Sequence, residues 1–295
     1  MKVEIIARET IKPTSPTPQS LRDFKLSLID QLAPHVYASL FFFYSFNGET
    51  DVCASEQSQQ LKKSFSDTLA LFYPLAGRLK DNIVIDCSYY GAVYVEAPVD
   101  CPLVCLLKQP NGDKLTQLIP IEIESTESIT GGFVSLVQAS FFDCDGVAVG
   151  VCISHKLAVT AAVATFMRCW AATTTTLGST TSVSLYDGAA LFPPREFSAE
   201  ILPITNFIKE KFAIKRFNTS KVAALKALAS SASVERPTRA EVVSLLIWKC
   251  TMSAARKNIG FSRLSAMIRV VNIRKRVVPQ LSKNSTRNLV GFYTA

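Results

Sequence analysis

Two apolar runs joined by an Asp-Gly pair constrain the fold of this chain more than any other stretch. Residues 133–142 and 147–154 are rich in β-branched and aromatic side chains, and Asp145 and Gly146 stand between them. An Asp-Gly pair between two such runs is typical of a tight β-hairpin, because both residues adopt the left-handed backbone of the turn at low cost. The sequence therefore predicts two antiparallel strands, and the second strand ends at His155.

Periodic segments on both sides of this hairpin predict a mixed α+β fold. Apolar residues recur at helical spacing from Leu61 to Phe72, and Pro74 ends the pattern. A second helix is predicted after His155, over residues 160–172. Other runs predict strands at residues 2–8, 35–46, 82–88, 92–99, 212–218 and 264–273 and helices at residues 219–230 and 237–257.

The same pass along the chain predicts two domains. Residues 173–194, rich in Thr, Ser and Gly, have the composition of a linker. We expect an N-terminal domain over residues 1–195 that carries His155, and a second domain over residues 205–295. The sheet of the second domain has only begun at Ala295 and would leave strand edges uncovered, so we expect this domain to be incomplete.

Capping residues mark the two helices expected in the second domain. Thr238 is followed three residues later by Glu241, which is the pattern of a capping box. Ser220 is predicted to cap the other helix, which is expected at residues 219–230. Both helices are therefore expected to begin close to these residues.

Composition bounds the class of protein. The chain has 295 residues, 48% of them hydrophobic, which is enough apolar material for two cores. Its longest apolar run is shorter than a membrane span, and charges interrupt the N-terminus, unlike in a signal peptide. Eight cysteines without a CxxC pair and two histidines disfavour a zinc site. We expect a cytoplasmic protein with reduced thiols, no membrane segment and no metal.

Charge is divided unevenly along the chain. Residues 209–295 hold 18 Lys and Arg against 3 Asp and Glu, whereas residues 1–208 hold 14 against 21. One interpretation of such a basic module is that it binds phosphate or nucleic acid. The alternative is that acidic residues elsewhere in a larger native molecule balance its charge. The aromatic residues here fall in apolar patterns typical of a core, so we expect no nucleic-acid partner; they are Phe212, Phe217, Trp248 and Phe261.

His155 is the candidate catalytic residue. A neutral imidazole at a strand end can take a proton from a hydroxyl or a thiol. The alternative is a packed histidine with one nitrogen hydrogen-bonded, and spacing alone favours that alternative. A dyad with Cys152 is disfavoured, because residues three apart in a strand point to opposite faces.

Six motifs follow one another in order: SPTPQSLRDFKLSLIDQL (15–32), LFYPLAGRL (71–79), SFFDCDGVAVGVCISHKLA (140–158), FPP (192–194), IWKC (247–250) and VVNIRKR (270–276). Together they resemble the plant BAHD acyltransferases, particularly the branch that acylates alkaloids and other specialised metabolites. The resemblance covers nearly the whole chain. The YPLAGRL part by itself is better explained as a helix stop followed by a strand than as a ligand contact.

The resemblance implies a fold and a reaction. The fold is two mixed-sheet domains like chloramphenicol acetyltransferase, with acyl-CoA and an acceptor alcohol meeting in a channel between them. His155 matches the histidine of the family's HxxxD motif, which removes the proton of the acceptor hydroxyl. Acetyl-CoA is the expected co-substrate and an alkaloid- or terpenoid-like alcohol the expected acceptor. No permanently bound cofactor is expected.

The chain departs from the family at the motif aspartate. Val159 stands where this aspartate would pair with the arginine that Arg274 matches, so both positions are expected to shape the site. Removing one partner of a buried ion pair costs roughly 3–5 kcal/mol. Arg274 is therefore expected either to turn to solvent or to pair with Asp143 or Asp145.

A second departure concerns the C-terminal part of the family. The DFGWG motif is absent from these residues, so we expect a C-terminally truncated chain of low activity. An alternative is a non-catalytic relative that binds acyl-CoA weakly or associates with a full-length relative. A monomer is expected by resemblance, although an uncovered apolar face of the second domain would favour association.

Overall fold

The computed structural model of the 295-residue chain describes residues 1–45, 53–121, 131–143, 146–157, 160–175, 188–196, 217–261, 264–278, 280 and 288–294. The predictions for Asp145, Val159 and residues 212–216 lie outside this part of the chain. The chain forms two compact units, of which unit 1 holds Met1–Phe212 with Ile273–Val290 and unit 2 holds Ala213–Asn272 with Gly291–Ala295.

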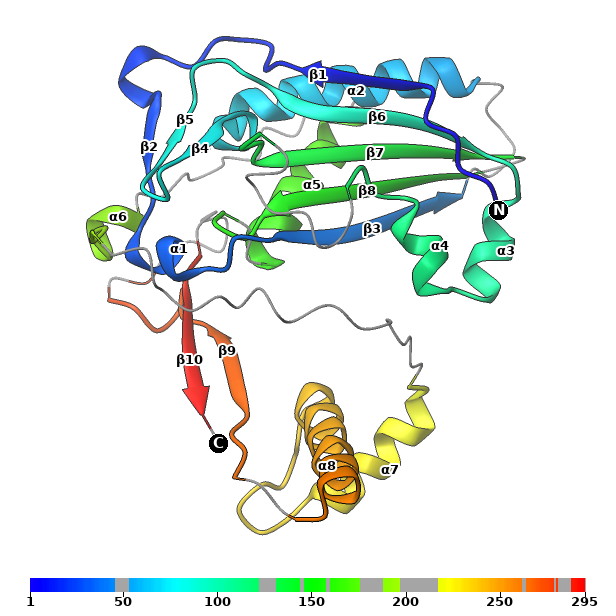
Figure 1. Ribbon diagram of the computed structural model, residues 1–295, viewed down its shortest axis with the longest axis vertical. Helices are drawn as coiled ribbons and strands as arrows, with labels where there is room; N and C mark the ends of the chain where they lie inside the picture. The colour runs from blue at the N-terminus through cyan, green and yellow to red at the C-terminus, as the bar shows by residue number, and fades with distance from the viewer. Residues whose placement is uncertain are drawn as a thin grey trace. The chain divides into compact units, whose positions relative to one another are not determined.

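Unit 1 is built on a mixed five-stranded sheet (Figure 1). Parallel pairing joins β6 to β7, and all other neighbours are antiparallel. The predicted hairpin is confirmed as β7 and β8, and the mixed α+β class with it. In spatial order the strands are β1 (Ala7–Ile11), β6 (Ala92–Val99), β7 (Ser135–Phe142), β8 (Gly146–Ser154) and β3 (Tyr37–Ser45).

The first strand begins later than predicted. The expected strand at residues 2–8 is β1 at Ala7–Ile11, and residue Val3 makes only an isolated bridge to Val99. Ile5 and Ile6 are both exposed. Val3 packs against the core but Ile5 does not, so the apolar alternation in this segment does not mark one continuous buried face.

Two helices cover one face of the sheet. They are α2 (Ala54–Leu71) and α5 (Thr160–Thr174), and both helices were predicted (Figure 1). The rings of Phe65 on α2 and Trp170 on α5 pack with centroids 4.8 Å apart. They share one core with Val149 and Val151 of β8. Aromatic and branched side chains at helical and strand spacing thus build the main core of unit 1.

The opposite face is covered by short elements, α3 (Leu103–Lys108), α4 (Gly112–Thr116) and the residues after them. Gly150 of β8 allows the chain to pass closely here, because a Cβ at this position would lie 1.9 Å from the carbonyl oxygen of Leu118. Every residue of β8 is consequently buried. Both faces of this strand are core, which explains its continuous apolar sequence.

Smaller elements complete unit 1. The predicted strand at residues 82–88 is the middle strand of a second sheet, in the order β2-β5-β4. LFYPLAGRL forms the end of α2, the turn η2 and β4, in agreement with the helix stop predicted for it. The bounds are η1 (Gln19–Leu21), β2 (Asp23–Lys25), α1 (Leu28–Leu32), η2 (Tyr73–Ala76), β4 (Arg78–Lys80), β5 (Val84–Asp86) and α6 (Gly188–Leu191).

Unit 2 contains α7 (Thr219–Ala229), α8 (Arg239–Ile259), β9 (Ile268–Asn272) and all but the first residue of its partner strand β10 (Val290–Thr294). The capping box of Thr238 and Glu241 is confirmed. The prediction of Ser220 as a cap is wrong, because α7 begins earlier and Asn218 accepts the N–H of Lys221. Asparagine is the stronger signal here since it stands one residue before the first helical residue.

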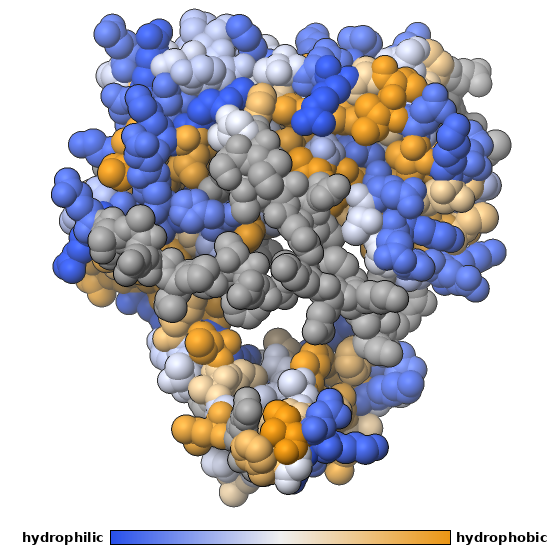
Figure 2. Space-filling view, in the orientation of Figure 1, coloured by the Kyte–Doolittle hydropathy of each residue, from blue (hydrophilic) through white to orange (hydrophobic). Residues whose placement is uncertain are grey.

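Unit 2 also exposes large apolar side chains. Figure 2 shows hydrophobic residues on its visible surface, and Phe261, predicted to be core, is exposed. Phe217 and Trp248 are half-buried. Among the helices within the described ranges, none is long and apolar enough to cross a membrane.

Candidate functional site

His155 follows directly on the buried strand β8. Its backbone N–H donates to the carbonyl of Val36 at 2.9 Å, which extends the β3–β8 ladder by one step beyond Ser154. The residue itself is half-buried. A rigid strand therefore brings the one histidine of the predicted motif to the end of the main sheet, where its side chain is no longer confined by two core faces.

Asn288 holds the same loop from a distant part of the sequence. Its side-chain Nδ2 donates to the carbonyl oxygens of His155 at 2.8 Å and Lys156 at 3.0 Å. Its own backbone N–H donates to Oδ1 of Asp30 at 3.3 Å. Asn288 is 2% exposed, so these bonds are made away from water, where an unmade bond is costly. Together they fix the backbone of His155 from a second side.

Lys156 points away from solvent and caps α1. Its Nζ donates to the carbonyl of Gln31 at 2.8 Å and to the carbonyl of Ala33. These carbonyls lie at the C-terminal end of the helix, where unpaired oxygens and the helix dipole favour a cation. The residue after the candidate base is thus tied to α1.

Asp30 completes this frame. Its Oδ2 accepts from the backbone N–H of Ser27 at 2.9 Å and from its hydroxyl at 2.7 Å, while Ser27 Oγ accepts the N–H of Asp30. This capping box starts α1, and the second oxygen of the carboxylate, Oδ1, accepts the backbone N–H of Asn288. One carboxylate therefore joins the start of α1 to the segment that holds His155.

Buried charge gathers around this loop. Among the described residues, the buried charged side chains are Asp30, Lys156 and Arg274. Arg274 follows Ile273, whose N–H donates to the carbonyl of Leu289, next to Asn288. Charged side chains are rarely buried, and two of these three, Asp30 and Lys156, are hydrogen-bonded around this loop, which marks it as a candidate site.

Two expectations for Arg274 are corrected. It does not turn to solvent, since it is 3% exposed, and burial lowers the pKa of its guanidinium. Asp143 is exposed and stands before β8, at the opposite end of the strand from His155. The nine residues of β8 separate its two ends by about 26 Å. The segment of Arg274 meets the His155 end through Leu289 and Asn288, so Asp143 is too far away to form a salt bridge with Arg274. The role of Val159 stays a prediction.

The ring of His155 is held less completely than its backbone. Its Nδ1 is buried, and none of the residues that the structure describes makes a hydrogen bond to it. A base acting through Nε2 carries its ring proton on Nδ1. Packing and the anchored backbone are therefore what orient this imidazole.

Cys152 is a core residue, as expected. It is fully buried on the sheet face that holds Tyr37 and Val93, and its Sγ lies 3.3 Å from the hydroxyl of Ser39. Burial raises the pKa of this thiol to about 12. A thiol that stays protonated at neutral pH is a poor nucleophile.

Sequence reasoning did not identify Asp30, Lys156 or Asn288. The pattern Ser27-x-x-Asp30 ahead of an apolar residue was available as a capping-box signal. Nothing local marked Lys156 or Asn288, because their partners are more than 120 residues away. The described part of the chain holds no group of three or more His, Cys, Asp or Glu suited to a metal.

Comparisons with known proteins find similarity along nearly the whole chain. The profile of the Transferase family matches residues 1–294. The chain is 38% identical over 288 residues to akuammiline synthase 1 of Alstonia scholaris, covering 96% of this chain and 66% of that protein. It is 36% identical over 294 residues to a limonoid 21-O-acetyltransferase of Melia azedarach, covering 98% and 68%. The chain thus spans about two thirds of these relatives.

Solved structures agree on the fold. The crystal structure of vinorine synthase aligns with a TM-score of 0.84 at 30% identity, covering 100% of this chain and 71% of that one. TRI101 of F. graminearum, complexed with coenzyme A and deoxynivalenol, aligns with a TM-score of 0.65 at 14% identity, covering 92% and 69%. The second likeness concerns the fold alone.

Proposed function

The chain belongs to the Transferase family, that of the BAHD acyltransferases, and from this premise we propose that it transfers an acyl group from acyl-CoA to a hydroxyl group. The acceptor is an alkaloid- or terpenoid-like alcohol of plant specialised metabolism. The acyl group is acetyl. Relatives named as limonoid O-acetyltransferases support both choices, while a relative in Strychnos nux-vomica is named as an N-malonyltransferase.

His155 acts as the general base in this proposal. Its Nε2 takes the proton of the acceptor hydroxyl as the oxygen attacks the thioester carbonyl carbon. The tetrahedral intermediate collapses with cleavage of the carbon–sulfur bond, and the imidazolium returns the proton to the leaving thiolate. The products are an ester and free CoA, so no covalent enzyme intermediate is needed.

The observation that carries the proposal is the position of His155. It stands at the end of a buried strand, with both its N–H and its carbonyl engaged by the protein and its side chain half-buried. A base must be held in place to gain from orientation, and base catalysis is typically worth about 10²–10⁴ in rate. A histidine that only packs against its neighbours does not require buried charged residues, such as Lys156 and Asp30, to hold the adjoining loop.

Arg274 and Val159 have a supporting role in the proposal. Val159 cannot accept a hydrogen bond, so it cannot be the carboxylate partner of Arg274. The loop after His155 is instead held by Lys156 and Asn288. We expect Arg274 to shape the site without touching the substrate.

The test compares the two histidines of the chain. His155→Ala and His35→Ala each remove one imidazole, and His35 is exposed. Purified variants are incubated with acetyl-CoA and a panel of alkaloid and terpenoid alcohols, and free thiol and ester are measured by colorimetry and mass spectrometry. Turnover lost by at least 100-fold in His155→Ala and retained in His35→Ala supports the proposal. Equal turnover in both variants would refute His155 as the base.

A non-catalytic role is the second candidate, because Val159 replaces the motif aspartate. Calorimetric titration with acetyl-CoA separates the two. Binding without turnover of any acceptor supports the non-catalytic role, whereas turnover excludes it.

A further inference from the structure

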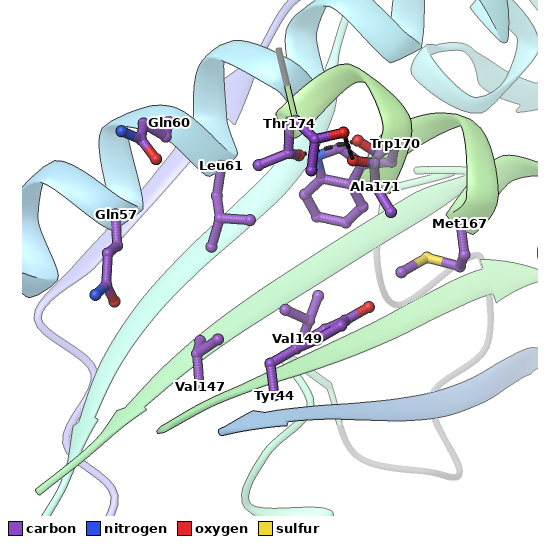
Figure 3. A pocket seen from close by; sticks show the side chains of 11 residues that line it. Tyr44, Gln57, Gln60, Leu61, Val147, Val149, Met167, Trp170, Ala171 and Thr174 are labelled. Atoms are coloured by element: carbon purple, nitrogen blue, oxygen red, sulfur yellow. Dashed lines mark hydrogen bonds between the residues drawn. The ribbon is translucent and has the colours of Figure 1, made fainter. Parts of the chain in front are cut away.

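A cavity of about 280 Å³ lies in unit 1 away from His155. It is bounded by α2, α5 and the strands β3 and β8 (Figure 3). Its floor is formed by Val147 and Val149, near the start of β8, whereas His155 follows the end of that strand. At about 3.3 Å per residue, Val147 lies some 26 Å from His155. The cavity is therefore separate from the candidate active site.

The walls of the cavity are apolar. Leu61 projects from α2 toward the sheet, and Met167 and Trp170 project from α5 on the other side (Figure 3). The indole N–H of Trp170 donates to the hydroxyl of Ser64 at 3.0 Å. Its one polar atom is thus already bonded, so the ring contributes a hydrocarbon surface. Met167 is a flexible thioether, which adapts to ligands of irregular shape.

The polar groups around the cavity are neutral. No Asp, Glu, Lys, Arg or His is found among its described lining residues. Thr174 Oγ1 donates to the carbonyl of Trp170 at 2.9 Å, so this hydroxyl is bonded within α5. Neutral hydrogen-bonding groups of Tyr44, Gln57 and Gln60 stand along the lining, and Tyr44 and Gln60 are exposed. A charged ligand would be desolvated here without a partner, which is costly.

We propose that this cavity binds a small, uncharged, mainly hydrocarbon molecule the size of two fused rings, carrying one hydrogen-bonding group. An apolar cavity of roughly 150 Å³ holds one benzene ring, and this one is nearly twice as large. The rings occupy the space between Leu61, Val149 and Trp170, and the polar group faces the exposed side with Tyr44 and Gln60. The charged phosphates of CoA do not suit it.

The probe for this site is 1-naphthol, which has two fused rings and one hydroxyl. Trp248→Phe leaves Trp170 as the one tryptophan of the chain. We expect saturable quenching of Trp170 emission by 1-naphthol and a rise in the thermal unfolding midpoint, since a ligand that binds only the folded state stabilises it. 1-Naphthalenesulfonate, of similar size but charged, is expected to bind at least 10-fold more weakly.

Two alanines of α5 provide a matched pair of variants. Ala171 and Ala164 are both exposed, but only Ala171 lines the cavity. In the Trp248→Phe background, Ala171→Phe is expected to weaken 1-naphthol binding at least 10-fold, and Ala164→Phe to leave it unchanged. Circular dichroism verifies that both variants are folded.

The proposal is overturned if quenching does not saturate up to the solubility of 1-naphthol, or if Ala171→Phe and Ala164→Phe bind it equally. Equal binding of the sulfonate removes the restriction to uncharged ligands. None of these measurements uses acyl transfer, so failure here leaves the role of His155 untouched, and failure of the His155 test leaves this site standing.

Discussion

At the scale of single residues, the candidate base owes its position to side chains that the motif does not include. His155 is fixed through its backbone by Val36 on one side and Asn288 on the other. Its ring nitrogen Nδ1 has no such partner within the described part of the chain. Substitutions of the supporting residues should therefore affect catalysis through the loop and not through direct contact with substrate.

Asn288→Ala removes both hydrogen bonds from Nδ2 to the His155 loop. We expect the free energy of unfolding to fall by about 1–3 kcal/mol, because two buried carbonyls lose a donor. If the chain turns over, kcat should fall while KM for acyl-CoA is unchanged. The control is Asn111→Ala, which removes the cap of α4 and should lower stability alone. Equal kcat in the two variants would contradict a positioning role.

The cysteines should differ in reactivity. The hydrogen bond from Ser55 lowers the pKa of the Cys53 thiol, which is exposed, whereas burial raises the pKa of Cys152 to about 12. A lower pKa means more thiolate at a given pH, so Cys53 should be alkylated first. Iodoacetamide near pH 7, followed by peptide mass spectrometry, is expected to label Cys53 and to spare Cys152 until urea unfolds the protein. Early labelling of Cys152 would contradict its burial.

At the scale of elements, contacts at the ends of helices fix much of the structure around His155. Lys156 donates to the C-terminal carbonyls of α1, and at the other end the side chains of Ser27 and Asp30 each accept the other's backbone N–H, so this short helix is held at both ends beside His155. A five-residue helix is too short to persist without such contacts. Its position depends on the loop that follows β8.

Lys156→Met keeps the aliphatic stem and removes the donors to Gln31 and Ala33. We expect a loss of about 1–3 kcal/mol in the free energy of unfolding, measured by urea denaturation, because the carbonyls at the end of α1 stay buried without a donor. Lys63→Met on the exposed side of α2 is the control and should change stability by less than about 0.5 kcal/mol. Similar values for both variants would show that the α1 contacts contribute nothing.

The start of α7 offers a direct comparison of two neighbouring polar residues. Asn218→Ala removes the acceptor of the Lys221 N–H and should destabilise α7 by about 1 kcal/mol. Ser220→Ala removes only a bond to the Asn218 side chain and should have little effect. Hydrogen exchange of the first-turn amides measures both. Faster exchange in Ser220→Ala than in Asn218→Ala would restore Ser220 as the cap.

At the scale of the whole molecule, the two units differ in how well they bury apolar residues. Unit 1 has a core of strands covered on both faces, whereas unit 2 leaves large apolar side chains exposed, among them Leu228 at 84%. Scattered exposed apolar residues are ordinary, but a group of them marks an interaction surface or a risk of aggregation. The division into domains at residues 1–195 and 205–295 stays a prediction.

The exposed apolar residues of unit 2 should make the 295-residue chain associate. We expect it to bind a hydrophobic dye and to elute as larger species with rising concentration in size-exclusion chromatography. A double variant, Leu228→Ser with Phe261→Ser, should reduce dye binding, while Leu71→Ser, an exposed position in unit 1, should not. A monomer without dye binding at high concentration would show that these residues are not accessible in solution.

The sequence by itself determined the β7–β8 hairpin, the helices α2 and α5 that cover one face of the sheet, the capping box at Thr238 and the family. Each of these depends on residues close together in the chain or on motifs in a fixed order. The expected exposure of Arg274 failed, as did the partner Asp143, the cap Ser220 and the buried Phe261. Only the tertiary structure decided what surrounds His155. Asp30, Lys156 and Asn288 meet there through bonds that span 123 to 258 residues, and no local pattern encodes a contact between segments so far apart.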